Sequence, residues 1–181
     1  WAMMTARMTR VWEEEKLLHP MQFGFRRGHS VTAPALMATL IAEKQVKEKK
    51  PMYVFSQDIS KAYDTVARHI GKEIAWRRLG LPEAYIQLLL DMDRHNKTVV
   101  VAAFGLTDDL LGEAEGVFEY ERGFCQGASE SPAGWVALYD VLLELQSKYA
   151  GDECIRLETH DGQNMEYVGS VFTDDAMWVA S

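Results

Sequence analysis

Two adjacent aspartates, Asp174 and Asp175, narrow the folds open to this chain more than any other feature. They stand between two short runs of strand-forming residues, GSVFT and AMWVA. This arrangement predicts a tight β-hairpin with both carboxylates at its tip, where oxygen ligands are able to hold a divalent cation. A second pair, Asp108 and Asp109, has no strand-forming flanks and is predicted to lie in a solvated loop. The strand context therefore carries the signal, and a doubled aspartate alone does not.

A third carboxylate, Asp58, ends another predicted strand, MYVFSQD at 52–58. If this strand neighbours the hairpin in one sheet, Asp58 and Asp174 converge. Two divalent ions roughly 3.5–4 Å apart, bridged by carboxylates, are suited to in-line phosphoryl displacement. Mg²⁺ keeps waters and substrate phosphates among its ligands, so a few aspartates suffice. The sequence thus predicts metal-assisted phosphoryl transfer. The alternative is that Asp58 caps a following helix and the pair only makes a turn.

Four segments resemble motifs of reverse transcriptases: QFGFRRGHS (22–30), SQDISKAYDTV (56–66), RGFCQGASESP (122–132) and FTDDAMWVAS (172–181). Each is weak alone, but their joint order and spacing are similar to those of non-LTR, LINE-like retrotransposons. The resemblance implies an RNA-directed DNA polymerase that adds dNMP to a primer 3′-OH with two Mg²⁺ ions, or with Mn²⁺. It also implies an RNA template, a DNA primer and dNTPs as partners, with a thumb and the remaining fingers segments supplied by the parent polyprotein.

The resemblance also implies roles for individual residues. In the family, the first aspartate of D-x-x-x-A-Y-D and the first of the paired aspartates ligate Mg²⁺, and the second of the pair contributes more weakly. The glutamine and glycine before the long palm helix contact the incoming nucleotide. The implied site residues are Asp58, Asp174 and Asp175 for catalysis and metal; Ile59, Ala62, Tyr63, Gln126 and Gly127 for the nucleotide; and Gly24, Phe25 and Arg26 for the template.

Tyr63 separates this reading from related polymerases. Palm polymerases that make RNA tend to have an aspartate five residues after the metal-binding one, whereas here that position is Tyr63 and the acid follows at Asp64. A bulky ring resembles the reverse-transcriptase gate that excludes a ribose 2′-OH. It therefore disfavours an RNA-making polymerase or a nucleotide cyclase. The alternative is an ordinary core tyrosine, and Asp64 is expected to cap a helix beginning near Thr65.

Two motifs depart from the family pattern or admit a simpler reading. The family often has proline where this chain has Cys125, and commonly an apolar residue where it has Glu130. These departures keep open a degenerate retroelement-derived domain that folds but is inactive, or that only binds nucleic acid. Ser131 with Pro132 is equally explained as a helix start. The basic loop at 24–27 either offers Arg26 or Arg27 to a template phosphate or is simply solvated.

Composition restricts the partners and the compartment. The 181 residues carry a net charge of −8, so the chain is acidic for a nucleic-acid-binding protein and is expected to rely on bound cations and on basic partners. Cys125 and Cys154 fit no metal spacing and indicate reduced thiols in the nucleus or cytoplasm. No zinc, P-loop or Gly-x-Ser-x-Gly pattern occurs. No apolar run approaches the roughly 20 residues of a membrane span, so no membrane association is expected.

The order of helical and strand patterns is typical of an α+β fold, an antiparallel sheet with helices packed on one face. The resemblance implies a right-hand polymerase palm plus part of the fingers. We expect residues 1–50 to be a partial fingers segment and 51–181 a palm ending just after the Asp-Asp hairpin, in one structural domain truncated at both ends. One helix is predicted to be capped at Ser30, with an inner side including Leu36 and Leu40. Another is predicted to be capped at Ser131, with Trp135, Leu138, Tyr139, Leu142 and Tyr149 on its inner side. A single strand is predicted at 98–104. A hairpin is predicted with Asp161–Gly162 in its turn.

Overall fold

The chain alternates helices with short strands, and the computed structural model describes residues 2–95, 97–106, 117–119, 123–124, 127–158 and 162–181. The helices are α1 (Ala2–Glu14), α2 (Thr32–Glu48), α3 (Ala62–Thr65), the π-helix η1 (His69–Ile74), α4 (Ala75–Arg78), α5 (Glu83–Arg94), α8 (Ser131–Ala150) and the 3₁₀ turn η2 (Gly151–Glu153). The strands are β1 (Tyr53–Asp58), β2 (Lys97–Val99), β3 (Val101–Ala102), β4 (Gly105–Leu106), β5 (Val117–Glu119), β6 (Ile155–Glu158), β7 (Asn164–Tyr167), β8 (Gly169–Phe172) and β9 (Asp175–Ala180). The expected α+β class is confirmed.

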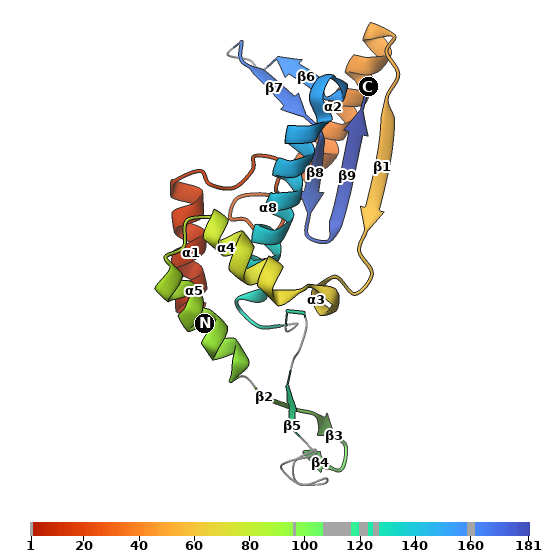
Figure 1. Cartoon of the computed structure of the whole chain (residues 1–181). Coiled ribbons are helices and arrows are strands. Elements are labelled where there is room, and N and C mark those ends of the chain that lie inside the picture. Colours follow the sequence, from red (N-terminus) through yellow and green to blue (C-terminus); the bar gives the residue numbers. More distant parts are fainter. Residues whose placement is uncertain (1, 96, 107–116, 120–122, 125–126, 159–161) are drawn as a thin grey trace.

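An antiparallel sheet in the order β1-β9-β8 forms the centre of the fold (Figure 1). Both predictions for this region are confirmed, the strand ending at Asp58 and the C-terminal hairpin. Tyr53 lies opposite Ala180 at the start of β1, so the register runs without a bulge down to Asp58. β8 is largely buried, whereas β1 is an exposed edge strand. The sheet therefore packs into the body of the protein through β8.

Two helices cover the two faces of this sheet. Ser56 and Met177 share one face and line a groove with the first half of α2. The next residues, Phe55 and Trp178, point to the other face and line a groove with the C-terminal half of α8. Figure 1 likewise draws α2 behind the sheet and α8 in front of it. The expectation of helices on one face only is therefore wrong.

Helix α2 begins and faces inward differently from the prediction. Its N-cap residue is Val31, with no capping side chain, and Ser30 instead accepts a hydrogen bond from Ala33 N through its carbonyl oxygen. Leu36 and Leu40 are 57% and 53% exposed. The buried residues of α2 are Pro34, Ile41 and Gln45. The inner stripe therefore follows the tertiary packing of this helix against the sheet rather than the most apolar side of its sequence.

Two other predicted helix starts are displaced by a residue or more. Glu130 is the N-cap of α8, so Ser131 is its first helical residue and does not cap it. Asp64 lies inside the short α3 and does not cap a helix starting near Thr65. The inner side of α8 is only partly as predicted, because Trp135 and Tyr139 are buried whereas Tyr149 is 74% exposed.

Smaller hairpins complete the chain. Strand β2 pairs with β5, and β3 pairs with β4, in a ribbon at the end of the molecule away from the sheet (Figure 1). The single strand predicted at 98–104 is thus divided between β2 and β3. The hairpin of β6 and β7 is confirmed by its pairing. Its predicted turn residue Asp161 lies outside the described residues, as do Asp108 and Asp109.

Two clusters of buried side chains hold these elements together. One joins the sheet to α2 and α8 through residues such as Ile41, Tyr139 and Val171. The other joins α1 to α4, α5 and α8 through Trp12 and Trp76, which are at most 1% exposed. The long helix α8 contributes to both clusters and so connects the sheet to the helical layer. Within the described residues, no helix is both long and apolar enough to cross a membrane.

Candidate active site

The candidate site lies where β1 ends and β8 turns into β9 (Figure 1). Phe172 pairs with Asp175 across the hairpin, so Thr173 and Asp174 make a two-residue turn. Thr173 has a φ of 58°, the left-handed conformation that such tight turns require. On the other side of β9, Asp58 lies directly opposite Asp175. The sheet therefore brings Asp58 beside the aspartate pair, in agreement with the predicted convergence.

The three carboxylates act together on one hydroxyl group of α8. The pKa of Tyr139 is raised to about 12, first by burial and then by the charges of Asp174, Asp175 and Asp58. Among the described residues, none forms an ion pair with any of the three aspartates. The end of the sheet thus carries negative charge that the described side chains do not neutralise.

The donor set fits a cation that is shared with a substrate. In the described part of the chain, no group of three or more His, Cys, Asp or Glu side chains is arranged to enclose a metal ion. Mg²⁺ requires less, since one or two carboxylates commonly hold it together with waters and substrate phosphates. Asp58 and Asp175 are like charges directly opposite on paired strands, an arrangement that is unfavourable without a counter-ion. A divalent cation would relieve that repulsion.

Two aromatic side chains of α8 fix the turn from below. Trp135 donates its indole Nε1–H to Thr173 O at 2.6 Å, and Tyr139 donates its hydroxyl to Asp174 O at 3.2 Å. The two rings also pack on each other, with centroids 5.0 Å apart. The sequence predicted both residues on the inner side of a helix but not as donors to the turn. The turn backbone is therefore held by buried donors while the carboxylates remain available.

Within the turn, one carboxylate also has a local hydrogen-bond partner. Thr173 Oγ1 lies 2.9 Å from Asp174 Oδ1 and 2.7 Å from Phe172 O. The hydroxyl carries a single proton, so it donates to one of these two oxygens at a time. This contact restricts the rotation of the Asp174 side chain at the hairpin tip.

Tyr63 lies beside the aspartates and is partly buried. Its ring packs on Trp135 at 5.4 Å between centroids and edge-on against Phe124 at 6.5 Å. Its pKa is raised to about 12 by burial, with a further contribution from the charge of Asp174. The tyrosine predicted as a sugar gate therefore lies close enough to Asp174, one of the predicted metal ligands, to be affected by its charge. Of the other predicted nucleotide contacts, Ala62 is buried and Ile59 packs partly against the core, which leaves their backbone rather than their side chains for a ligand.

The loop before α8 is fastened to Tyr63. Phe124 N donates to Tyr63 O at 2.7 Å, and the Phe124 ring is so closely packed that a Cβ on Gly71 or Gly134 would approach it within 2.7 or 2.9 Å. Gly127 is exposed, with a φ of 84°. Gln126 and Cys125 lie outside the described residues. The segment that precedes the predicted nucleotide motif is therefore hydrogen-bonded, through Phe124, to the backbone of the predicted gate residue Tyr63.

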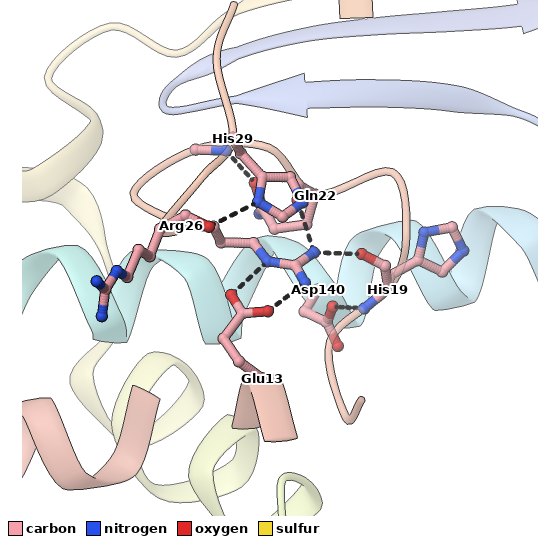
Figure 2. Close-up of polar contacts among 8 residues, drawn as sticks. Glu13, His19, Gln22, Arg26, His29 and Asp140 are labelled. Carbon is pink, nitrogen blue, oxygen red and sulfur yellow. Dashed lines mark hydrogen bonds and ion pairs between the residues drawn. The ribbon is translucent and has the colours of Figure 1, made fainter. Parts of the chain in front are cut away.

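The predicted template residues are divided between different surroundings. Gly24 packs so closely on the Thr173–Asp174 turn that a Cβ would lie 2.3 Å from Thr173 N. Phe25 is 47% exposed. Arg26 points inward, where its guanidinium binds Glu13 and two backbone carbonyls (Figure 2). Of the two arginines considered for a phosphate contact, Arg27 is the exposed one.

Comparison with protein families identifies one match over nearly the whole chain. The family described as "Reverse transcriptase (RNA-dependent DNA polymerase)" matches residues 2–181. This range runs from α1 to β9 and includes the three carboxylates and Tyr63. Comparison with curated proteins gave no match.

Proposed function

Because the chain belongs to the reverse transcriptase family, we propose that it is an RNA-directed DNA polymerase that transfers dNMP to a primer 3′-OH and releases pyrophosphate. We propose further that it derives from a non-LTR, LINE-like element, on the strength of the four sequence motifs. The observation that carries the proposal is the register that sets Asp58 opposite Asp175, beside a turn that presents Asp174. The partners are an RNA template, a DNA primer and dNTPs, together with the thumb and remaining fingers segments of the parent polyprotein.

Asp58, Asp174 and Asp175 are the residues that would hold two Mg²⁺ ions. When bound, such ions activate the attacking oxygen and stabilise the charge that develops on the leaving group. The contribution of the protein is positional. Trp135 and Tyr139 hold the turn backbone through hydrogen bonds to Thr173 O and Asp174 O, so the carboxylates need little reorganisation when a substrate arrives.

Tyr63 would select the sugar. Its ring is held between Phe124 and Trp135, so it has little freedom to yield to an extra hydroxyl group. A ribose 2′-OH would then clash with the ring, whereas deoxyribose would fit. Gln126 and Gly127, which follow Phe124 closely in the sequence, would contact the incoming nucleotide and the template, with Gly24, Phe25 and Arg27 along the template.

Primer extension tests the proposal directly. The chain, expressed with the neighbouring segments of its reading frame, is expected to extend a DNA primer on an RNA template when dNTPs and Mg²⁺ are present. Asp58→Asn and Asp174→Asn should each reduce extension by about 10³-fold, because several kcal/mol of charge stabilisation are lost. Asp108→Asn, in the second aspartate pair, is the matched control and should extend normally. Normal extension by Asp58→Asn or Asp174→Asn would remove that carboxylate from the mechanism.

Glu130 favours a second candidate, a degenerate domain that only binds nucleic acid. Glu130 is 3% exposed, and its Oε2 has no hydrogen-bond partner among the residues that the structure describes. A buried carboxylate oxygen that lacks such a partner, beside the loop that precedes α8, is unfavourable for that region. Binding of a template–primer duplex without extension, in the wild-type chain with its flanking segments, would support this candidate and contradict the polymerase.

A further inference from the structure

All three nitrogens of the Arg26 guanidinium donate hydrogen bonds to groups within the protein. Its Nε and NH2 groups donate to the two carboxylate oxygens of Glu13, both at 2.7 Å. Its NH1 group donates to His19 O at 3.1 Å and to Gln22 O at 2.8 Å. Figure 2 shows the guanidinium between α1 and the loop that leads to α2. The side chain of Arg26 is 10% exposed and that of Glu13 is 32% exposed, so the guanidinium is the more shielded partner of the pair.

The backbone that Arg26 holds runs directly to the catalytic turn. Gln22 forms a parallel bridge with Val171 of β8, and Phe23 N donates to Val171 O at 2.8 Å. The Gln22 side chain then accepts a hydrogen bond from Gly24 N at 3.0 Å. Gly24 in turn lies against Thr173, with no space for a Cβ. The segment 19–26 is therefore a strap from the Arg26 guanidinium to the backbone of the turn.

The other end of the strap is fixed to α8. His19 N donates to the carboxylate of Asp140, which is fully buried and also accepts from Arg78 at 2.6 Å. The His19 ring lies 3.1 Å from Ser147 Oγ on the same helix. With Asp140 at one end and Glu13 at the other, the strap has little freedom to shift along β8.

We propose that the Glu13–Arg26 ion pair is a positioning device that sets the catalytic turn Thr173–Asp174, and that Arg26 is a positioning residue rather than a template contact. The inference rests on the proposed function, because it gives Arg26 its role in polymerisation. The fork of the guanidinium is essential: a lysine supplies one point charge and cannot bind both carboxylate oxygens and two carbonyls at fixed angles. Exchanging the two charges would not restore the contacts, since a carboxylate at position 26 would face the carbonyls of His19 and Gln22.

The indole N–H of Trp135 provides a direct reporter of the turn, because it donates to Thr173 O. In ¹H–¹⁵N spectra of the chain, its resonance is identified by its loss in Trp135→Phe. Arg26→Gln and Arg26→Lys are expected to displace this resonance, and Gly24→Ala should displace it through steric pressure. Arg27→Gln and Glu14→Gln are the matched controls, since each alters an exposed neighbour, and they should leave the resonance in place.

Kinetics supply the second readout. Arg26→Gln and Arg26→Lys should lower kcat by about 10- to 100-fold, as small misplacements of catalytic groups do, with the KM for template–primer retained. Arg27→Gln should instead raise that KM and reduce its salt dependence, as a phosphate contact does. An unmoved Trp135 resonance in both Arg26 variants would overturn the proposal, and so would a raised KM with unchanged kcat.

If Arg26→Gln fails to fold, Glu13→Gln decides, because it leaves both carbonyl contacts of Arg26 in place. A displaced Trp135 resonance in Glu13→Gln supports the positioning role, and an unmoved one contradicts it. If the wild-type chain shows no polymerase activity, the proposed function fails, yet the resonance still reports whether Arg26 sets the turn. The two failures are therefore distinguishable.

Discussion

The carboxylates of the helical layer are paired with cationic side chains, whereas those at the end of the sheet face each other without such partners among the described residues. On α5, Asp93 Oδ2 forms an ion pair with Lys72 Nζ at 2.7 Å, and on α8 Asp140 Oδ2 forms one with Arg78 NH1 at 2.6 Å. Both carboxylates are buried, at 7% and 0% exposure. Asp58 and Asp175 are exposed, oppose each other across two strands, and have no cationic partner among the described residues. Negative charge is thus neutralised by ion pairs in the helical layer, whereas it accumulates at the end of the sheet.

The difference follows from the cost of desolvation. A carboxylate taken out of water without a partner costs several kcal/mol, so a buried one must be matched inside the fold. An exposed one remains solvated and tolerates a like neighbour at a cost of only about 0.2–1 kcal/mol. A group of unmatched carboxylates at strand ends is therefore a place where an external cation brings the compensating charge. The comparison distinguishes acids that serve stability from acids available for chemistry.

The largest effect on stability is expected when the buried ion pair between Lys72 and Asp93 is removed. Asp93→Asn would remove the carboxylate that lies 2.7 Å from Lys72 Nζ, and Lys72 is buried at 1% exposure near the rings of Phe124 and Trp76. We expect the free energy of unfolding to fall by about 3–5 kcal/mol, measured by urea denaturation. The control is Asp91→Asn on the same helix, where the side chain is 64% exposed and a change within about 0.5 kcal/mol is expected. Equal costs at the two positions would contradict the comparison.

A second prediction concerns Tyr63, whose ring packs on Trp135 and Phe124. Tyr63→Ala should raise ribonucleotide incorporation relative to deoxyribonucleotide by about 10- to 100-fold, since a lost steric contact is worth roughly 1–3 kcal/mol. Competition between dNTP and rNTP in primer extension gives the ratio. Tyr139→Phe is the control, because Tyr139 shares the environment but contacts the turn through its hydroxyl group. An unaltered ratio in Tyr63→Ala would refute the gate.

The sequence predicted the positions of the candidate carboxylates in the sheet better than it predicted the contacts that support them. Asp58 and Asp174 could be placed because strand alternation and a two-residue turn are local patterns, and the register then follows. The donors Trp135 and Tyr139 could not be assigned, because their partners are backbone carbonyls brought near only by tertiary packing. The inward contacts of Arg26 could not be predicted for the same reason. Its motif indicated a ligand contact, and nothing local announces that Glu13 is its partner.

Helix faces show a similar limit. The periodic apolar pattern correctly predicted that a helix follows Ser30, but it placed Leu36 and Leu40 inside when the buried residues include Gln45. A polar residue can take an inner position when the neighbouring element supplies partners, and periodicity has no information on that element. The existence of an element is thus readable from local pattern, whereas the face that it buries depends on the rest of the fold.

The third prediction concerns the pH dependence of stability that His19 contributes beside the buried Asp140. Burial lowers the pKa of His19 below its ordinary 6.5, an effect that the charge of Asp140 partly offsets. The unfolded chain therefore binds the proton more readily than the folded one. Stability contributed by neutral His19 is present above pH 6.5 and is lost as the pH falls from 6.5 toward the folded-state pKa, with a slope of at most about one proton. Urea denaturation across this interval should show a flatter profile for His19→Gln, and an unchanged profile would assign the pH dependence elsewhere.

The smallest expected effect concerns the carboxylates at the end of the sheet. Here a substitution is expected to leave stability unchanged or to raise it, whereas Asp93→Asn lowers it. In metal-free buffer, Asp58→Asn should leave the free energy of unfolding unchanged or raise it by up to about 1 kcal/mol, because it removes a like charge directly across the strands from Asp175. Mg²⁺ should raise the melting temperature of the wild-type chain, as a ligand of the folded state does, and should do so less for Asp58→Asn. Asp152→Asn, fully exposed far from the turn, controls for general effects of charge. A loss of stability in Asp58→Asn that approaches that of Asp93→Asn would mean that Asp58 is matched after all, and the distinction between the two regions would fail.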